Sequence, residues 1–496
     1  MTSTSKRTSA DTPSRSGRIL LLTAAATFMA FLDTTVVNVA FPALHSSFPH
    51  EALTNLTWVV TSYAVFFAAL LTPVGRFADV LGRRQMFLGS LALFTAASLA
   101  CALAPSVSYL IAFRAVQGIG AAGMIPSALG LVLAETPPDK RAAAIGLWGA
   151  AGSMAAAAGP ALGGVLVSEL SWRWAFLPNV PVGLVALVVG ARLLPKRPGT
   201  GGGLPDLLGT VVITVGIGAG VIGLTKGGDW GWRSGQTWGW IAGGLVLVAY
   251  SVLRSRRQAV PVIDTELWGS RMFVAANLTS FFIGAGLFVW FLSGPLYLVT
   301  IWHYSILRAG LAVTPGAIAS AITAITVGRK VKPQNQRPIV AGGLLIFFAL
   351  SIWAYLVLGS KPMFLAVWLP YGMLGGAVLG AALTSVTTAA AISVHPIKFA
   401  SGTGLNTAAR QVGGAIGVAA MAAVFAAHNL GHPQAYLDAF LLAGIFELVA
   451  FFPALSLFSR SGMAAVAATQ RQVQQQMAAM AAQASAAKQE PAGKEG

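Results

Sequence analysis

Three ionisable residues lie inside long apolar stretches of this sequence. Asp33 stands fifteen residues after Arg18, and Arg114 and Glu447 lie within later stretches. A charge at the centre of a bilayer costs about 3 kcal/mol or more, so such a residue is paired or functional. We interpret Asp33 as a carboxyl that binds and releases a proton, with Arg114 as its electrostatic modulator and Glu447 as a second candidate for proton coupling. Desolvation predicts that Asp33 holds its proton when no substrate is bound. The alternative interpretation of Asp33 is a structural ion pair or a protonated core carboxyl.

The sequence motifs for ATP binding, metal binding and disulfide formation are absent from this sequence. The sequence contains no G-x-x-x-x-G-K-[ST] motif, so we expect no ATP site and a process driven by a gradient. The six histidines are scattered, and Cys101 is the one cysteine, so we predict no metal site and no disulfide. We expect no cofactor and no enzymatic activity.

The composition indicates which kind of secondary structure and surroundings hold Asp33, Arg114 and Glu447. Hydrophobic residues make up 56% of the 496 residues and charged residues 9%, whereas a soluble surface needs roughly a quarter charged. The net charge of +17 comes from short basic groups at the ends of apolar stretches, not from one stripe, which argues against a nucleic-acid partner. No obligate protein partner is evident. The sequence therefore predicts an all-α polytopic membrane protein.

Apolar stretches of roughly 20 residues, long enough to cross a bilayer, identify the spans. We predict about fourteen, near residues 19–43, 54–76, 85–104, 107–133, 142–167, 174–194, 207–225, 237–253, 272–300, 306–327, 338–359, 363–388, 403–427 and 436–458. With both termini in the cytoplasm, about 25 of the 32 Lys and Arg residues fall on that side, as positive-inside topology requires. We therefore expect a multi-pass protein with cytoplasmic tails at 1–18 and 459–496.

The stretch from Gly75 to Arg84 resembles the signature loop of the major facilitator superfamily. We expect it to form a loop between the second and third spans. Its glycines permit a tight turn, and Asp79 can pair with arginines. The resemblance implies a conformational latch, with these gating residues: Gly75, Asp79, Gly82, Arg83 and Arg84.

Further stretches resemble the fourteen-helix drug/proton antiporter group of that superfamily. They comprise 32–40, 114–118, the glycines between 149 and 164, 172–181, 309–315 and 404–414. The resemblance implies proton coupling at Arg114 and gating by Gly159, Pro160 and Gly163. It also implies a gating role for Arg410 and Gln411, which we expect to open the thirteenth span. The second half departs from the pattern, because Lys332 stands where Asp79 would repeat.

The resemblance predicts two six-helix halves, 19–194 and 266–458, separated by two inserted helices in 195–265. Such a protein would export amphipathic small molecules, drugs or antibiotics, across the bacterial inner membrane in exchange for protons by alternating access. Among the residues that line its cavity we expect these four: Asn38, Trp58, Tyr63 and Gln117. Two alternatives stay open: a dedicated metabolite permease of the same fold, and a non-transporting membrane receptor or scaffold.

Overall fold

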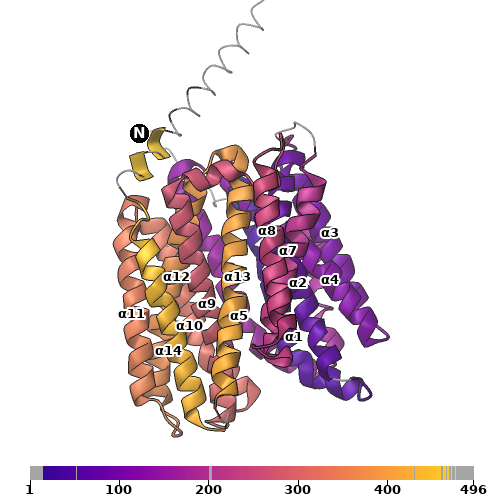
Figure 1. Cartoon of the computed structure of the whole chain (residues 1–496), viewed down its shortest axis with the longest axis vertical. Coiled ribbons are helices and arrows are strands. Elements are labelled where there is room, and N and C mark those ends of the chain that lie inside the picture. The colour runs from indigo at the N-terminus through magenta and orange to yellow at the C-terminus, as the bar shows by residue number, and fades with distance from the viewer. Residues whose placement is uncertain are drawn as a thin grey trace, which may run out of the picture.

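The computed structural model describes residues 15–51, 53–199, 204–428 and 431–459, with short stretches as far as residue 475. These residues form helices and turns, and none of them forms a strand. The long helices are α1 (Arg15–Ser47), α2 (Leu53–Leu81), α3 (Arg83–Ala102), α4 (Val107–Glu135), α5 (Arg141–Glu169), α6 (Asn179–Leu193), α7 (Leu207–Trp230), α8 (Gly235–Ser255), α9 (Arg271–Thr300), α10 (Ile306–Lys330), α11 (Gln336–Val357), α12 (Leu369–Ile392), α13 (Phe399–Ala426) and α14 (Pro433–Ala454) (Figure 1).

Among the described residues, thirteen of these helical segments are long enough and apolar enough to span a membrane. The remaining one, α5, contains side chains at 156, 157, 160, 161 and 168 that the structure does not describe. The prediction of an all-helical polytopic membrane protein with about fourteen spans is confirmed.

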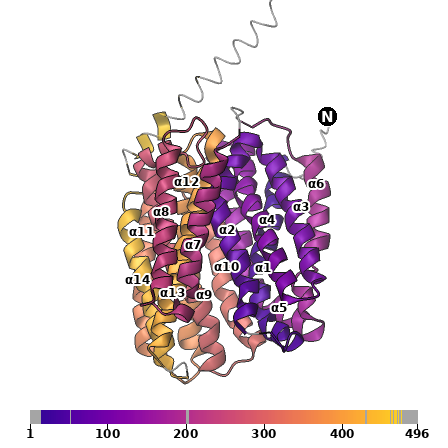
Figure 2. The ribbon, with the colours of Figure 1, turned by 45° about the vertical axis from the view of Figure 1, so that its right-hand side comes forward.

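The helices form two groups, α1 to α6 and α9 to α14, which lie side by side (Figure 2). The helices α7 and α8 pack against each other, and α7 also packs against α2 and α13, at the boundary between the groups. They occupy residues 207–255, inside the segment expected to hold two inserted helices. We call α1–α6 the first half and α9–α14 the second half.

One end of the bundle carries the turn at Gly82, together with Asp206 and Lys398, and we call this end the motif face. The expected loop from Gly75 to Arg84 is mostly helical: α2 continues to Leu81 and α3 begins at Arg83. Only Gly82 leaves the helical conformation, with φ of 111°. Glycine tolerates this left-handed region because it has no β-carbon.

The two halves contact each other near the motif face. A β-carbon at Gly75 of α2 would lie 2.7 Å from the Ala400 carbonyl oxygen of α13. On the other side of the interface, Gly328 of α10 packs against the backbone at Ala142 of α5. Small residues let these helices approach at backbone distance. At the opposite face, α3 and α4 lean away from the second half in the view of Figure 1.

Candidate functional site

Asp33 and Arg114 form a buried ion pair in the first half. Asp33 lies midway along α1 and Arg114 lies in α4, and each is 1% exposed. The Arg114 Nη1 is 2.6 Å from the Asp33 Oδ2. Arg114 also donates to the Val59 carbonyl at 3.0 Å, and its guanidinium lies over the Tyr63 ring, 4.3 Å from the centroid. The structure therefore places Arg114 directly beside Asp33, while their roles in proton coupling stay predictions.

Two amide side chains complete the shell around Asp33. Its Oδ1 accepts hydrogen bonds from the Gln117 Nε2 at 2.8 Å and from the Asn179 Nδ2 at 2.9 Å. Both amides also donate to the hydroxyl of Ser98 in α3. We call these five residues, Asp33, Ser98, Arg114, Gln117 and Asn179, the carboxylate network.

Both carboxylate oxygens of Asp33 act as acceptors: one faces the Arg114 guanidinium, and the other accepts from the Gln117 and Asn179 amides. A protonated carboxyl would have to donate through one of these oxygens. The carboxylate therefore links α1 to α4 and α6 through three hydrogen bonds, one of them to a cation. The expectation that Asp33 holds its proton when no substrate is bound stays a prediction.

Sequence reasoning missed two members of the network. Asn179 lies within the stretch 172–181 but was not singled out, although it is the amide that opens α6. Ser98 occupies a small-residue position on α3, and nothing in the local pattern distinguishes it from Ser90 or Thr95. Only the packing of α3 against α4 and α6 brings the Ser98 hydroxyl to the two amides.

The predicted substrate-binding residues separate in the structure. Tyr63 and Gln117 are buried around Arg114, where Tyr63 donates to the Ala30 carbonyl at 3.4 Å. Trp58 is half-buried beside α7, with its ring 5.6 Å from the Lys226 ammonium. The side chain of Asn38 lies outside the described part of the chain. Roles in substrate binding stay predictions.

The structure does not bring Glu447 together with Asp33. Glu447 lies in α14 of the second half, is 0% exposed and packs against Gly286 of α9. Neither of its carboxylate oxygens has a hydrogen-bond partner among the residues described. A bare carboxylate is costly in such a place, which favours a neutral side chain there.

Arg410 does not open α13. That helix begins at Phe399, so Arg410 and Gln411 stand near its middle, both half-buried. The backbone at Arg410 packs closely on Gly284 of α9. The expected position at a helix end is therefore wrong, because the helix starts four residues before the predicted span at 403, while the gating role stays a prediction.

A second polar cluster joins the two halves at the motif face. The Asp79 side chain in α2 is fully buried and forms an ion pair with Arg83 at 2.7 Å. Asp79 also accepts from the backbone N–H groups of Ala400 at 3.2 Å and Ser401 at 2.7 Å, in the first turn of α13. Helix N-termini carry a partial positive charge that favours an anion there. Arg83 in turn donates to the Pro396 carbonyl at 2.7 Å. We call this cluster the latch.

Arg84, predicted to share the latch, lies apart from it. Its guanidinium donates to the Ala191 carbonyl at the end of α6, in the same half. Nearby on the motif face, Lys398 bridges Asp264 at 2.6 Å and Glu266 at 2.7 Å. The hydrogen bond from Lys398 lowers the pKa of Glu266 below its usual value. The motif face therefore carries ion pairs beside both halves, and the hydrogen bonds of the latch join the halves there.

Glycines of α5 fit closely against α1. A β-carbon at Gly163 would lie 3.1 Å from the Val36 Cα, and one at Gly159 would overlap the Thr35 side chain. Both glycines therefore permit a close contact within the first half. The side chain of Pro160 lies outside the described residues. Whether this contact opens during a cycle stays a prediction.

The described residues thus form a polytopic membrane protein with a buried ionisable network and a set of polar contacts that joins its two halves at one end. A sequence model of the Major Facilitator Superfamily matches residues 23–418. The chain belongs to the major facilitator superfamily, and it is a transporter, not an enzyme.

Several bacterial relatives carry names that describe export or resistance. The chain is 35% identical to a cephamycin export protein of Amycolatopsis lactamdurans, over 89% of this chain and 93% of the relative. It is 32% identical to a multidrug resistance protein of Mycobacterium tuberculosis, over 82% and 75%. It is 31% identical to a methylenomycin A resistance protein of Streptomyces coelicolor, over 87% and 90%.

A solved structure shares the fold. The crystal structure of a human organic anion transporter matches with a TM-score of 0.62 and 15% sequence identity, over 89% of this chain and all of that chain. At this identity the match concerns the fold alone.

Proposed function

We propose that this protein exports amphipathic small molecules, drugs or antibiotics, across the bacterial inner membrane in exchange for protons. The names of the relatives support export and resistance. Proton coupling is supported by the carboxylate network, in which the titratable Asp33 is buried among three hydrogen-bond donors from two other helices, α4 and α6. The expected absence of a cofactor, a metal and an ATP site stays a prediction.

The network converts proton binding into a change of helix packing. In the ionised form, Asp33 on α1 holds Arg114 and Gln117 of α4 and Asn179 of α6. In the protonated form, one acceptor site is lost and the attraction to Arg114 disappears. The helices that the carboxylate joins are then free to shift against one another. Proton occupancy thereby biases the equilibrium between two conformations, as coupling requires.

Alternating access is the mechanism that this arrangement supports best. Asp79 and Arg83 of the first half hold Pro396, Ala400 and Ser401 of the second half at the motif face. Rocking of the two halves about the midplane would break this latch and open the motif face. The described conformation is then the one in which the motif face is sealed.

The charge distribution supports a cytoplasmic motif face. Basic residues gather at that end of the described chain: Arg15, Arg18, Arg83, Arg84, Arg192, Arg254, Arg256, Arg257, Arg329 and Lys330. Lys and Arg accumulate on the cytoplasmic side of membrane proteins. Since α1 begins and α14 ends at this face, both termini would lie in the cytoplasm.

Transport by purified protein tests the proposal. A growth-inhibition panel in a pump-deficient host, including a cephamycin, methylenomycin and ethidium, first selects a substrate. Proteoliposomes with an imposed pH gradient should then move it uphill with the wild type and not with Asp33→Asn, which should still bind it. Asp206→Asn is the matched control, because Asp206 pairs with Arg254 at 2.6 Å away from the network. Uphill movement by Asp33→Asn at the wild-type rate would contradict the coupling role, and binding without any movement by the wild type would favour a receptor.

A further inference from the structure

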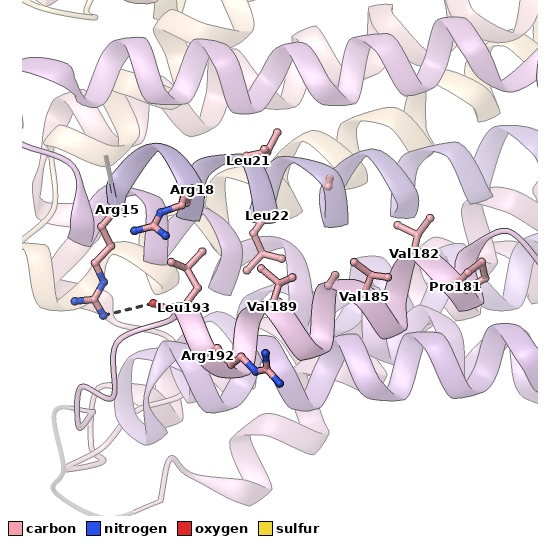
Figure 3. A pocket seen from close by; sticks show the side chains of 12 residues that line it. Arg15, Arg18, Leu21, Leu22, Pro181, Val182, Val185, Val189, Arg192 and Leu193 are labelled. Atoms are coloured by element: carbon pink, nitrogen blue, oxygen red, sulfur yellow. Dashed lines mark hydrogen bonds between the residues drawn. The ribbon is translucent and has the colours of Figure 1, made fainter. Parts of the chain in front are cut away.

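A groove between α1 and α6 opens on the outside of the first half. It has a volume of about 970 Å³ (Figure 3). Apolar side chains that are largely exposed line most of it, among them Leu21 at 71%, Val185 at 64% and Val182 at 45%. In a membrane protein such side chains face lipid, so the apolar floor of the groove contacts acyl chains.

One end of this groove holds three arginines. Arg15 and Arg18 stand one turn apart on α1, and Arg192 lies near the same end of α6, with its guanidinium on the side of α6 away from α1 (Figure 3). The Arg15 Nη2 donates to the Leu193 carbonyl at 3.4 Å. Among the described residues, none of the three arginines forms an ion pair with an acidic side chain. Arg15 and Arg18 carry like charges three residues apart on one helix and repel each other, so a bound anion would stabilise this end of the groove.

The dimensions of the groove match one leaflet of a bilayer. From Pro181 to Leu193, α6 rises about 18 Å, and half of the hydrocarbon core is about 15 Å thick. The apolar floor thus spans the acyl region of a single leaflet, and the arginines lie at the level of the headgroups. Guanidinium groups bind phosphate oxygens through paired hydrogen bonds.

We propose that this groove binds an anionic phospholipid, with its phosphate held by Arg15 and Arg18 and an acyl chain lying along the valines of α6, while Arg192 adds positive charge at the same end of the groove. Basic pockets between transmembrane helices recognise such headgroups. The site is distinct from the carboxylate network and does not depend on the proposed transport activity. Bound lipid would brace α1, which carries Asp33, against α6, which carries Asn179.

Lipid binding to the purified protein in detergent tests the assignment. Native mass spectrometry and the apparent melting temperature would be measured with added dioleoylphosphatidylglycerol, dioleoylphosphatidylcholine or inorganic phosphate. Phosphatidylglycerol should remain bound and raise the melting temperature by several degrees, and the other two should not. In the triple variant Arg15→Gln/Arg18→Gln/Arg192→Gln, its apparent affinity should fall by about tenfold or more.

A matched control separates this site from general attraction to a basic surface. Arg256→Gln/Arg257→Gln/Arg329→Gln removes the same charge from exposed positions on the same face and should retain the lipid. Val185→Trp keeps every arginine, fills the groove and should lose the lipid, which covers the case in which the triple variant does not fold. Deletion of residues 2–12 tests whether the chain's own N-terminal segment occupies the groove, and lipid retention should be unchanged. Equal loss in the control triple, equal protection by phosphatidylcholine or phosphate, or dependence on residues 2–12 would overturn the proposal.

Discussion

Ser401 donates two hydrogen bonds to the carboxylate of Asp79, one from its backbone N–H and one from its hydroxyl, each 2.7 Å long. Asp79 stands near the end of α2 and Ser401 in the first turn of α13, so the bonds join the two halves. Because Arg83 neutralises the same carboxylate at 2.7 Å, the contact is an ion pair placed on a helix N-terminus. The Asp79–Arg83 pair thus lies within the first half, and its hydrogen bonds to Pro396, Ala400 and Ser401 are the contacts that a separation of the halves would break.

Removing the Asp79 carboxylate should impair turnover more than substrate binding. In Asp79→Ala the sealed conformation loses its main contact at the motif face, so we expect the maximal export rate to fall by about tenfold, with affinity changed by less than about threefold. Transport rates in proteoliposomes and binding in detergent measure the two quantities. Asp206→Ala is the control, because Asp206 pairs with Arg254 inside the α7–α8 pair. Loss of affinity with a normal rate at saturation would show that Asp79 serves the substrate site.

Close packing of α2 on α13 should be sensitive to a single methyl group. In Gly75→Ala the new β-carbon would lie 2.7 Å from the Ala400 carbonyl oxygen, so the helices must separate slightly. We expect slower export and a lower melting temperature. Gly89→Ala is the matched control, since nothing lies within 4 Å of its β-carbon and alanine favours a helix over glycine by up to about 1 kcal/mol. Equal behaviour of the two variants would argue against tight packing at Gly75.

The sequence predicted the helices well because their apolar character is local. Composition and span length identified about fourteen helices, and the deep positions of Asp33 and Arg114 pointed to an ion pair that the structure contains. The continuation of α2 through Ala78 was missed, because polar and charged residues beyond Gly75 looked like a loop. In the structure Ala78 is buried and Asp79 is satisfied by the second half, so the helix continues there.

Partners that come from distant helices could not be predicted. Asn179 reaches Asp33, and Ser98 reaches the Asn179 and Gln117 amides, only through the packing of α6 against α1 and α3 and of α3 against α4. The backbone partners of the latch, at Pro396 and Ala400, carry no side-chain signal at all. Such contacts depend on tertiary arrangement, which periodicity does not encode.

Breaking the buried pair from either side should cost more than removing both charges. Arg114→Gln leaves Asp33 without its cation, and Asp33→Asn leaves Arg114 without its anion, each in a site only 1% exposed. Uncompensated buried charges destabilise proteins by about 3–5 kcal/mol. The double variant should therefore melt at a higher temperature than the less stable single variant, while all three fail in uphill export. Additive losses in the double variant would contradict direct coupling of the two charges.

Glu447 should respond to neutralisation in the opposite way from Asp33. Both carboxylates are buried, but Asp33 accepts three hydrogen bonds, whereas the Glu447 oxygens have no partner among the described residues. Since an unpaired carboxyl in an apolar site is destabilising, Glu447→Leu should raise the apparent melting temperature, and Glu447→Gln should leave uphill export within about threefold of the wild type. Asp33→Asn should lower both the apparent melting temperature and the rate of uphill export in the same assays. If Glu447→Gln instead abolishes uphill export while substrate binding survives, Glu447 carries a transported proton, and the carboxylate network of the first half is not sufficient for coupling.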